Sequence, residues 1–176
     1  MKKKKTDFEA GFWSGTRNHS AVGLLETFFQ FNDLAEVKQN LSLMMQCSVQ
    51  RKARIRKDPA GIFHLHQSLR SLVRAARLIG KKAKKGRYSV LSQTLSPKAV
   101  TGSLSAEEYH NPAKVFRHAF KTCTLQEYND FLSTVAYFSL SDLRCEDEAG
   151  IITPYLHLTK ILDAAWLIVE RTATGK

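Results

Sequence analysis

The sequence predicts an all-α protein: a single-domain bundle of five or six helices with a flexible basic loop. Apolar residues recur at steps of three and four along most of the chain, which is typical of amphipathic helices. Several of these stretches begin with residues that cap helices, such as Asp58 before Pro59. Nine Gly and four Pro among 176 residues are too few for the many turns of a sandwich or barrel of short strands.

Length and composition favour one folded domain. A chain of 176 residues with 43% hydrophobic residues can bury a sizeable core and is not disordered as a whole. Residues 1–18 show no clear helical period, so we expect a loose N-terminal leader followed by a single helical domain over 19–176. Within that domain, residues 81–105 are first Lys-rich and then Ser/Thr-rich, which predicts a long loop.

Three helices are predicted in the N-terminal half. The first begins near Ser20, and the second follows a cap at Asn32 or Asp33 and continues into the basic run at 51–57. The third begins at Asp58–Pro59, where the proline needs no N–H. Gly80 stands where a helix often ends with a left-handed residue, so the third helix is expected to stop there.

The C-terminal half carries further start signals. Ser105 with Glu108 and Thr124 with Glu127 are spaced as capping boxes, and Asn111–Pro112 repeats the cap-then-proline pattern. A polar acidic turn is expected at 146–150. The last helix is then predicted to run from Thr153–Pro154 to about Arg171. It is apolar around most of its circumference, which predicts a central position in the bundle.

Positive charge is concentrated in one segment. The formal net charge is +11, and residues 51–88 hold thirteen basic residues against a single acid, Asp58. On the third helix four of these cations form one row, roughly 140° from the apolar stripe. That row is Arg70, Arg74, Arg77 and Lys81. The complete set of candidate anion-binding residues is Arg51, Lys52, Arg54, Arg56, Lys57, Arg70, Arg74, Arg77, Lys81, Lys82, Lys84, Lys85 and Arg87.

This charge predicts a non-enzymatic accessory protein whose basic face, 51–87, binds nucleic acid or another polyanion mainly through phosphates. A second hypothesis is a protein-interaction module or homodimer that docks an acidic partner and binds no nucleic acid. The basic surface could also serve solubility alone. Its arginines could instead pair with the chain's own carboxylates, such as Glu146, Asp147 and Glu148. A third hypothesis is an enzyme whose site is assembled from residues far apart in the sequence.

No pattern in the sequence predicts catalytic residues, a metal site or a cofactor. His64 and His66 are two apart, so on a helix they point roughly 200° from each other and cannot share an ion. The three cysteines are widely spaced and form no metal-binding pair, which is typical of reduced thiols. The sequence leaves the enzyme question open but favours a non-enzymatic role. It also predicts a cytoplasmic protein without a membrane span.

Overall fold

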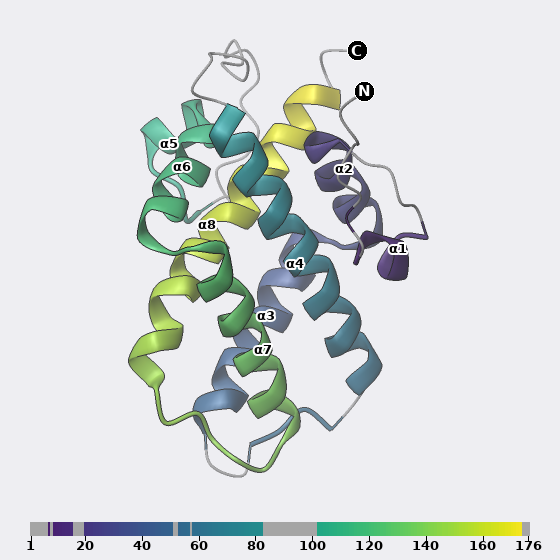
Figure 1. Ribbon diagram of the computed structural model, residues 1–176, viewed down its shortest axis with the longest axis vertical. Coiled ribbons are helices and arrows are strands. Elements are labelled where there is room, and N and C mark those ends of the chain that lie inside the picture. The colour runs from purple at the N-terminus through teal and green to yellow at the C-terminus, as the bar shows by residue number, and fades with distance from the viewer. Residues whose placement is uncertain are drawn as a thin grey trace.

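The computed structural model describes residues 7, 9–15, 20–50, 53–56, 58–82 and 102–173 (Figure 1). Over these residues the chain is a single all-α domain without strands, and the predicted fold class is confirmed. Six helices are long and two are short. They are α1 (Ala10–Trp13), α2 (Ala21–Phe31), α3 (Leu34–Val49), α4 (Pro59–Lys82), α5 (Ala106–His110), α6 (Pro112–Thr122), α7 (Leu125–Leu140) and α8 (Glu148–Ala173). Most of the predicted basic loop, at 83–101, lies outside the described residues.

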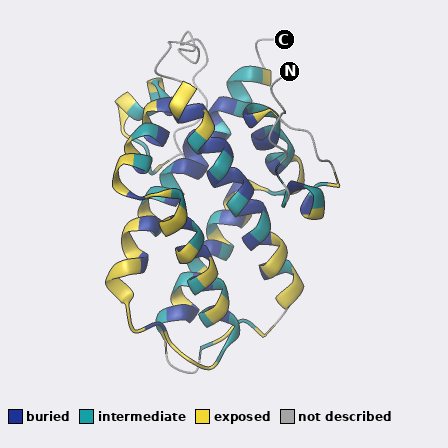
Figure 2. Ribbon diagram, in the orientation of Figure 1, coloured by how far each residue is buried: buried dark blue, intermediate teal, exposed yellow. Residues whose placement is uncertain are grey.

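Two long helices organise the bundle. α4 runs along the long axis, with α1 and α2 against one flank and α6 and α7 against the other (Figure 1). α8 contacts α2, α3, α4, α5, α6 and α7, so its predicted central position is confirmed. The buried residues lie on the sides of the helices that face one another (Figure 2). Leu69, Leu72 and Ile79 of α4 meet Leu158, Leu162 and the other buried residues of one continuous core.

Five of the predicted helix starts are confirmed, and each of the five follows from local hydrogen bonding. The side chains of Ser20, Asp33 and Asp58 accept hydrogen bonds at 3.0, 3.0 and 2.9 Å from the backbone N–H three residues ahead. Ser105 and Thr124 both form complete capping boxes. Such a cap stabilises a helix by about 1 kcal/mol.

The second predicted helix is shorter than expected. α3 ends at Val49, and residues 53–56 of the basic run are not helical. The N–H of Ile55 donates instead to the carbonyl of Ser139 at 2.7 Å, and the Ile55 side chain packs against the core. The chain therefore crosses the end of α7 at this point. The sequence of residues 51–57 alone does not indicate this contact.

Gly80 does not end the third helix. Its predicted left-handed conformation is wrong, because α4 continues to Lys82 and Gly80 has no positive φ. A Cβ at this position would lie 3.1 Å from the Cβ of Phe116 and 3.4 Å from the backbone nitrogen of Arg117. Because glycine has no Cβ, α4 and α6 can approach each other closely at this position.

The last helix starts earlier than expected. α8 begins at Glu148, so Pro154 lies inside it and the predicted turn over 146–150 is wrong at its final three residues. Asp147 caps this start, accepting a hydrogen bond from the N–H of Gly150 at 3.0 Å. Pro154 was interpreted as the first residue of the helix. The helix starts instead at the capping residue Asp147, whose side chain accepts from an N–H three residues ahead.

Part of the predicted N-terminal leader is ordered against the bundle. Ala10 and Trp13 of α1 are 0% and 4% exposed, so the expectation of a loose segment is wrong at these residues. The indole N–H of Trp13 donates to the hydroxyl of Ser71 on α4 at 3.0 Å. The Trp13 ring also meets the rings of Phe28 and Phe31 edge-on, which fixes α1 between α2 and α4.

Candidate functional site

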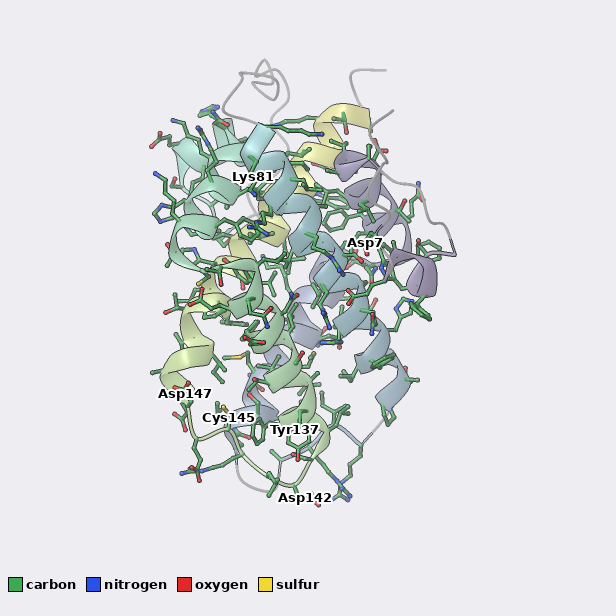
Figure 3. The ribbon with its side chains drawn as sticks, in the orientation of Figure 1. Asp7, Lys81, Tyr137, Asp142, Cys145 and Asp147 are labelled. Carbon is green, nitrogen blue, oxygen red and sulfur yellow. The ribbon has the colours of Figure 1, made fainter. Side chains whose placement is uncertain are left out.

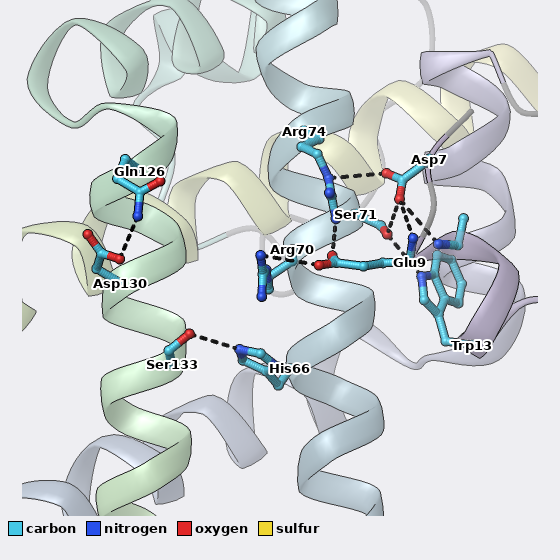
Figure 4. A network of polar contacts seen from close by, with 11 residues as sticks. Asp7, Glu9, Trp13, His66, Arg70, Ser71, Arg74, Gln126, Asp130 and Ser133 are labelled. Atoms are coloured by element: carbon cyan, nitrogen blue, oxygen red, sulfur yellow. Dashed lines mark hydrogen bonds and ion pairs between the residues drawn. The ribbon is translucent and has the colours of Figure 1, made fainter. Parts of the chain in front are cut away.

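Two arginines of the predicted cationic row are neutralised by the N-terminal segment. The guanidinium of Arg70 lies 3.2 Å from a carboxylate oxygen of Glu9 (Figure 4). Arg74 lies 3.2 Å from Asp7 through its Nε and also pairs with Glu9. The side chains of Asp7 and Glu9 are only 9% and 14% exposed. Arg70 and Arg74 are therefore held by the protein's own carboxylates.

Further hydrogen bonds position the carboxylate of Asp7. Asp7 accepts from the N–H groups of Glu9 and Ala10 at 3.1 and 3.2 Å, which makes it a cap for α1. It also accepts from the hydroxyl of Ser71 at 3.3 Å. The Ser71 hydroxyl also accepts the hydrogen bond from the indole N–H of Trp13. One connected network therefore holds α1 against α4 (Figure 4).

We expect the double substitution Asp7→Asn/Glu9→Gln to lower the free energy of unfolding by about 2 kcal/mol, because it removes charge-assisted contacts that are largely shielded from water. Chemical denaturation followed by circular dichroism measures this. The matched control is Glu107→Gln/Asp142→Asn, which removes two exposed ion pairs, with Lys114 at 2.7 Å and Arg54 at 3.2 Å. The control should lose much less stability, because ion pairs between exposed side chains contribute little. Equal losses in the two variants would contradict a stabilising role for the network.

The remaining predicted cations differ in their surroundings. Arg54 pairs with Asp142, whereas Arg77, Lys81 and Lys82 have no carboxylate within ion-pair distance among the described residues. The same holds for the exposed Arg56. None of the arginines described pairs with the acids at 146–148. The other candidates lie outside the described residues: Arg51, Lys52, Lys57, Lys84, Lys85 and Arg87.

Sequence reasoning missed a second group of cations, on α6. Lys114, Arg117, His118 and Lys121 are spaced i, i+3, i+4 and i+7, which places them on one side of a helix. The other side carries Val115, Phe116 and Ala119, all buried. This spacing was visible in the sequence. It was not predicted as a site because α6 has far fewer basic residues than the segment 51–88.

The close contact at Gly80 is flanked by cations of both α4 and α6. Gly80 abuts Phe116 and the backbone of Arg117, so Lys81 and Arg117 are each within one residue of the contact. Lys81 lies at the end of α4 beside α5 and α6 (Figure 3). We define the α4/α6 basic face as Arg77, Lys81, Lys82, Arg117 and Lys121. No described carboxylate forms an ion pair with any of these five, whereas Lys114 is paired with Glu107.

A histidine pair borders this face. The rings of His118 on α6 and His157 on α8 have centroids 5.7 Å apart. Burial lowers the pKa of His157, and the charges of His118 and Lys160 act in the same direction while Glu108 opposes them. His157 is therefore harder to protonate than an ordinary histidine.

The described residues show no arrangement for metal-dependent or nucleophilic chemistry. No three His, Cys, Asp or Glu side chains in this part of the chain gather closely enough to hold a metal ion. Cys47, Cys123 and Cys145 are free and buried, and burial raises the pKa of the Cys47 and Cys123 thiols. His64 is exposed while His66 is buried beside Ser133, so the two do not face one site.

Among the described residues, every helix is either too short or too polar to cross a bilayer.

Comparison with known proteins adds no relative: no protein-family model, curated protein or solved structure matches this chain.

Proposed function

We propose that the protein binds nucleic acid through phosphate contacts made by the α4/α6 basic face. The observation that carries this proposal is that its five cations come from two touching helices and have no carboxylate partner among the described residues. Like charges held close together repel one another, and a polyanion relieves that repulsion. The site proposed from the structure is thus smaller than the predicted face 51–87 and is shifted towards α6.

The geometry favours contacts to phosphates over contacts to bases. Lys81, Lys82 and Lys121 are exposed, and Arg77 and Arg117 are half-buried, so the cationic groups lie on the surface of a rigid helix pair. Lysine and arginine on such a surface neutralise phosphates without reading sequence. The exposed aromatic rings among the described residues, Phe12, Phe31, Phe63 and Tyr137, lie outside α6 and the last turn of α4, so none is placed there to stack on bases.

The substitution Arg117→Gln/Lys121→Gln tests the proposal. We expect it to weaken binding of a labelled short DNA duplex about tenfold, because it removes two of five phosphate contacts. Fluorescence anisotropy with the full chain measures the affinity. Both residues point away from the core side of α6, so the fold should be retained, which circular dichroism verifies.

The matched control is Arg54→Gln/Arg56→Gln, which lowers the net charge equally but lies in the linker between α3 and α4. It should change the affinity by less than about twofold. A similar loss in both variants would show that net charge alone attracts the duplex. Absence of binding by the unaltered protein at low salt would overturn the proposal and favour the protein-interaction hypothesis.

A further inference from the structure

A groove lies between α7 and the first turns of α8. Its volume is about 620 Å³, within the range of about 300–1,000 Å³ for ligand pockets. It lies towards the other end of the long axis from Lys81, near Cys145 and Asp147 (Figure 3). The residues that line it are Thr122, Cys123, Glu127, Asp130, Phe131, Thr134, Phe138, Cys145, Glu146, Asp147, Ala149, Gly150, Ile151, Thr153 and Pro154.

The lining contains firmly held apolar residues. Cys123, Phe131, Cys145 and Ile151 are between 3% and 5% exposed and belong to the main core. The segment between the two helices is fixed as well, because the N–H of Cys145 donates to the carbonyl of Ser48 at 2.7 Å. The groove is therefore formed before any partner arrives, which reduces the entropy lost on binding.

The charged residues of the groove all have one sign. Four exposed carboxylates line it, and no Lys, Arg or His is among the lining residues. None of the four forms an ion pair with a described residue. Glu127 and Asp147 cap helices, so their charge has a structural use. Among the described residues, Asp130 accepts a hydrogen bond only from the Gln126 amide, at 2.8 Å (Figure 4), and Glu146 has none.

Pro154 adds a backbone acceptor to the same groove. Because proline has no N–H, it cannot donate to the carbonyl of Gly150 four residues earlier in α8. Both residues line the groove. The Gly150 carbonyl can therefore accept a hydrogen bond from a donor outside the regular helix.

We propose that this groove docks a Lys/Arg-rich segment of a partner protein that inserts one large apolar side chain between α7 and α8. The carboxylates match the positive charge of such a segment, and the apolar lining matches the inserted side chain. Nucleic acid carries the wrong charge for this groove, so the site is separate from the α4/α6 basic face. The two proposals can fail independently.

The probe is a fluorescein-labelled peptide of lysine and arginine with a single central phenylalanine, and anisotropy with the full chain measures its affinity. We expect Asp130→Asn/Glu146→Gln to weaken binding about tenfold at low ionic strength, because two complementary charges are lost while helix caps remain. The matched control, Glu26→Gln/Glu36→Gln, removes two carboxylates from α2 and α3. It should change the affinity less than about twofold.

A second peptide separates apolar docking from charge attraction. Replacing its phenylalanine with serine should weaken binding about tenfold, the effect of losing one buried aromatic side chain at a small interface. Equal affinities of the two peptides, or equal losses in the groove and control variants, would overturn the proposal. Light scattering that shows a dimer, abolished by Asp130→Asn/Glu146→Gln, would make the occupant a second copy and would also overturn it.

Discussion

Affinity for a short DNA duplex should fall about 500-fold when salt is raised from about 50 mM to about 200 mM, if all five cations of the α4/α6 basic face contact phosphates. Each phosphate contact releases condensed counterions, so the logarithm of the association constant falls with log salt at a slope of about −0.9 per contact. Five contacts give a slope of about −4.5. Anisotropy titrations across this salt range measure the slope directly.

The same slope, measured for a variant, gives the number of phosphate contacts that the variant keeps. Arg117→Gln/Lys121→Gln should reduce it to about −2.7, so that the same rise in salt lowers affinity only about 40-fold. Arg54→Gln/Arg56→Gln should leave the slope of the unaltered protein. Affinity that is insensitive to salt would exclude binding through phosphates, whatever its strength.

Replacing Gly80 with leucine should lower the free energy of unfolding by about 3 kcal/mol, the upper range for overpacking a core. A Cβ there would already lie 3.1 Å from the Cβ of Phe116. The backbone of α6 lies 3.4 Å away, and backbone cannot rotate aside as a long side chain can. A leucine side chain would therefore force α4 and α6 apart. Chemical denaturation measures the loss.

Two variants frame this prediction. Gly80→Ala should have a smaller effect, because its higher helix propensity of about 1 kcal/mol offsets the tight contact. Gly102→Leu places the same side chain where a Cβ meets nothing within 4 Å, so stability should change by less than about 0.5 kcal/mol. If Gly80→Leu is as stable as Gly102→Leu, α4 and α6 do not pack closely at this point.

Most of the helix starts were predictable because their chemistry is local, although the equally local cap at Asp147 was missed. Ser20, Asp33 and Asp58 each receive a hydrogen bond from an N–H three residues ahead, so residue type and spacing suffice to identify the cap. Helix ends were harder. The end of α3 depends on Ile55 bonding to Ser139, and the continuation of α4 through Gly80 depends on Phe116. Ser139 and Phe116 are distant in sequence from the helix ends concerned, so no local pattern predicts these contacts.

The candidate site, too, was predictable from the sequence only in part. The amphipathic spacing of α4 placed its arginines opposite its leucines, but their charge partners could not be read from it. The pairing of Arg74 with Glu9 joins residues 65 positions apart and requires α1 to dock through Trp13 and Ser71. The acids at 146–148 were the wrong candidates, because they lie at the start of α8, towards the opposite end of the bundle's long axis from Lys81 (Figure 3).

The sequence by itself determined that the chain is helical, where most helices begin, and that α8 is central, because caps and apolar spacing act within a few residues. Only the tertiary structure decided which of the described cations pair with a carboxylate of the chain and which do not. A charge at the surface of a helix is paired or free according to what packs beside it. For Arg74 that neighbour is the N-terminal segment, and for Lys81 it is α6.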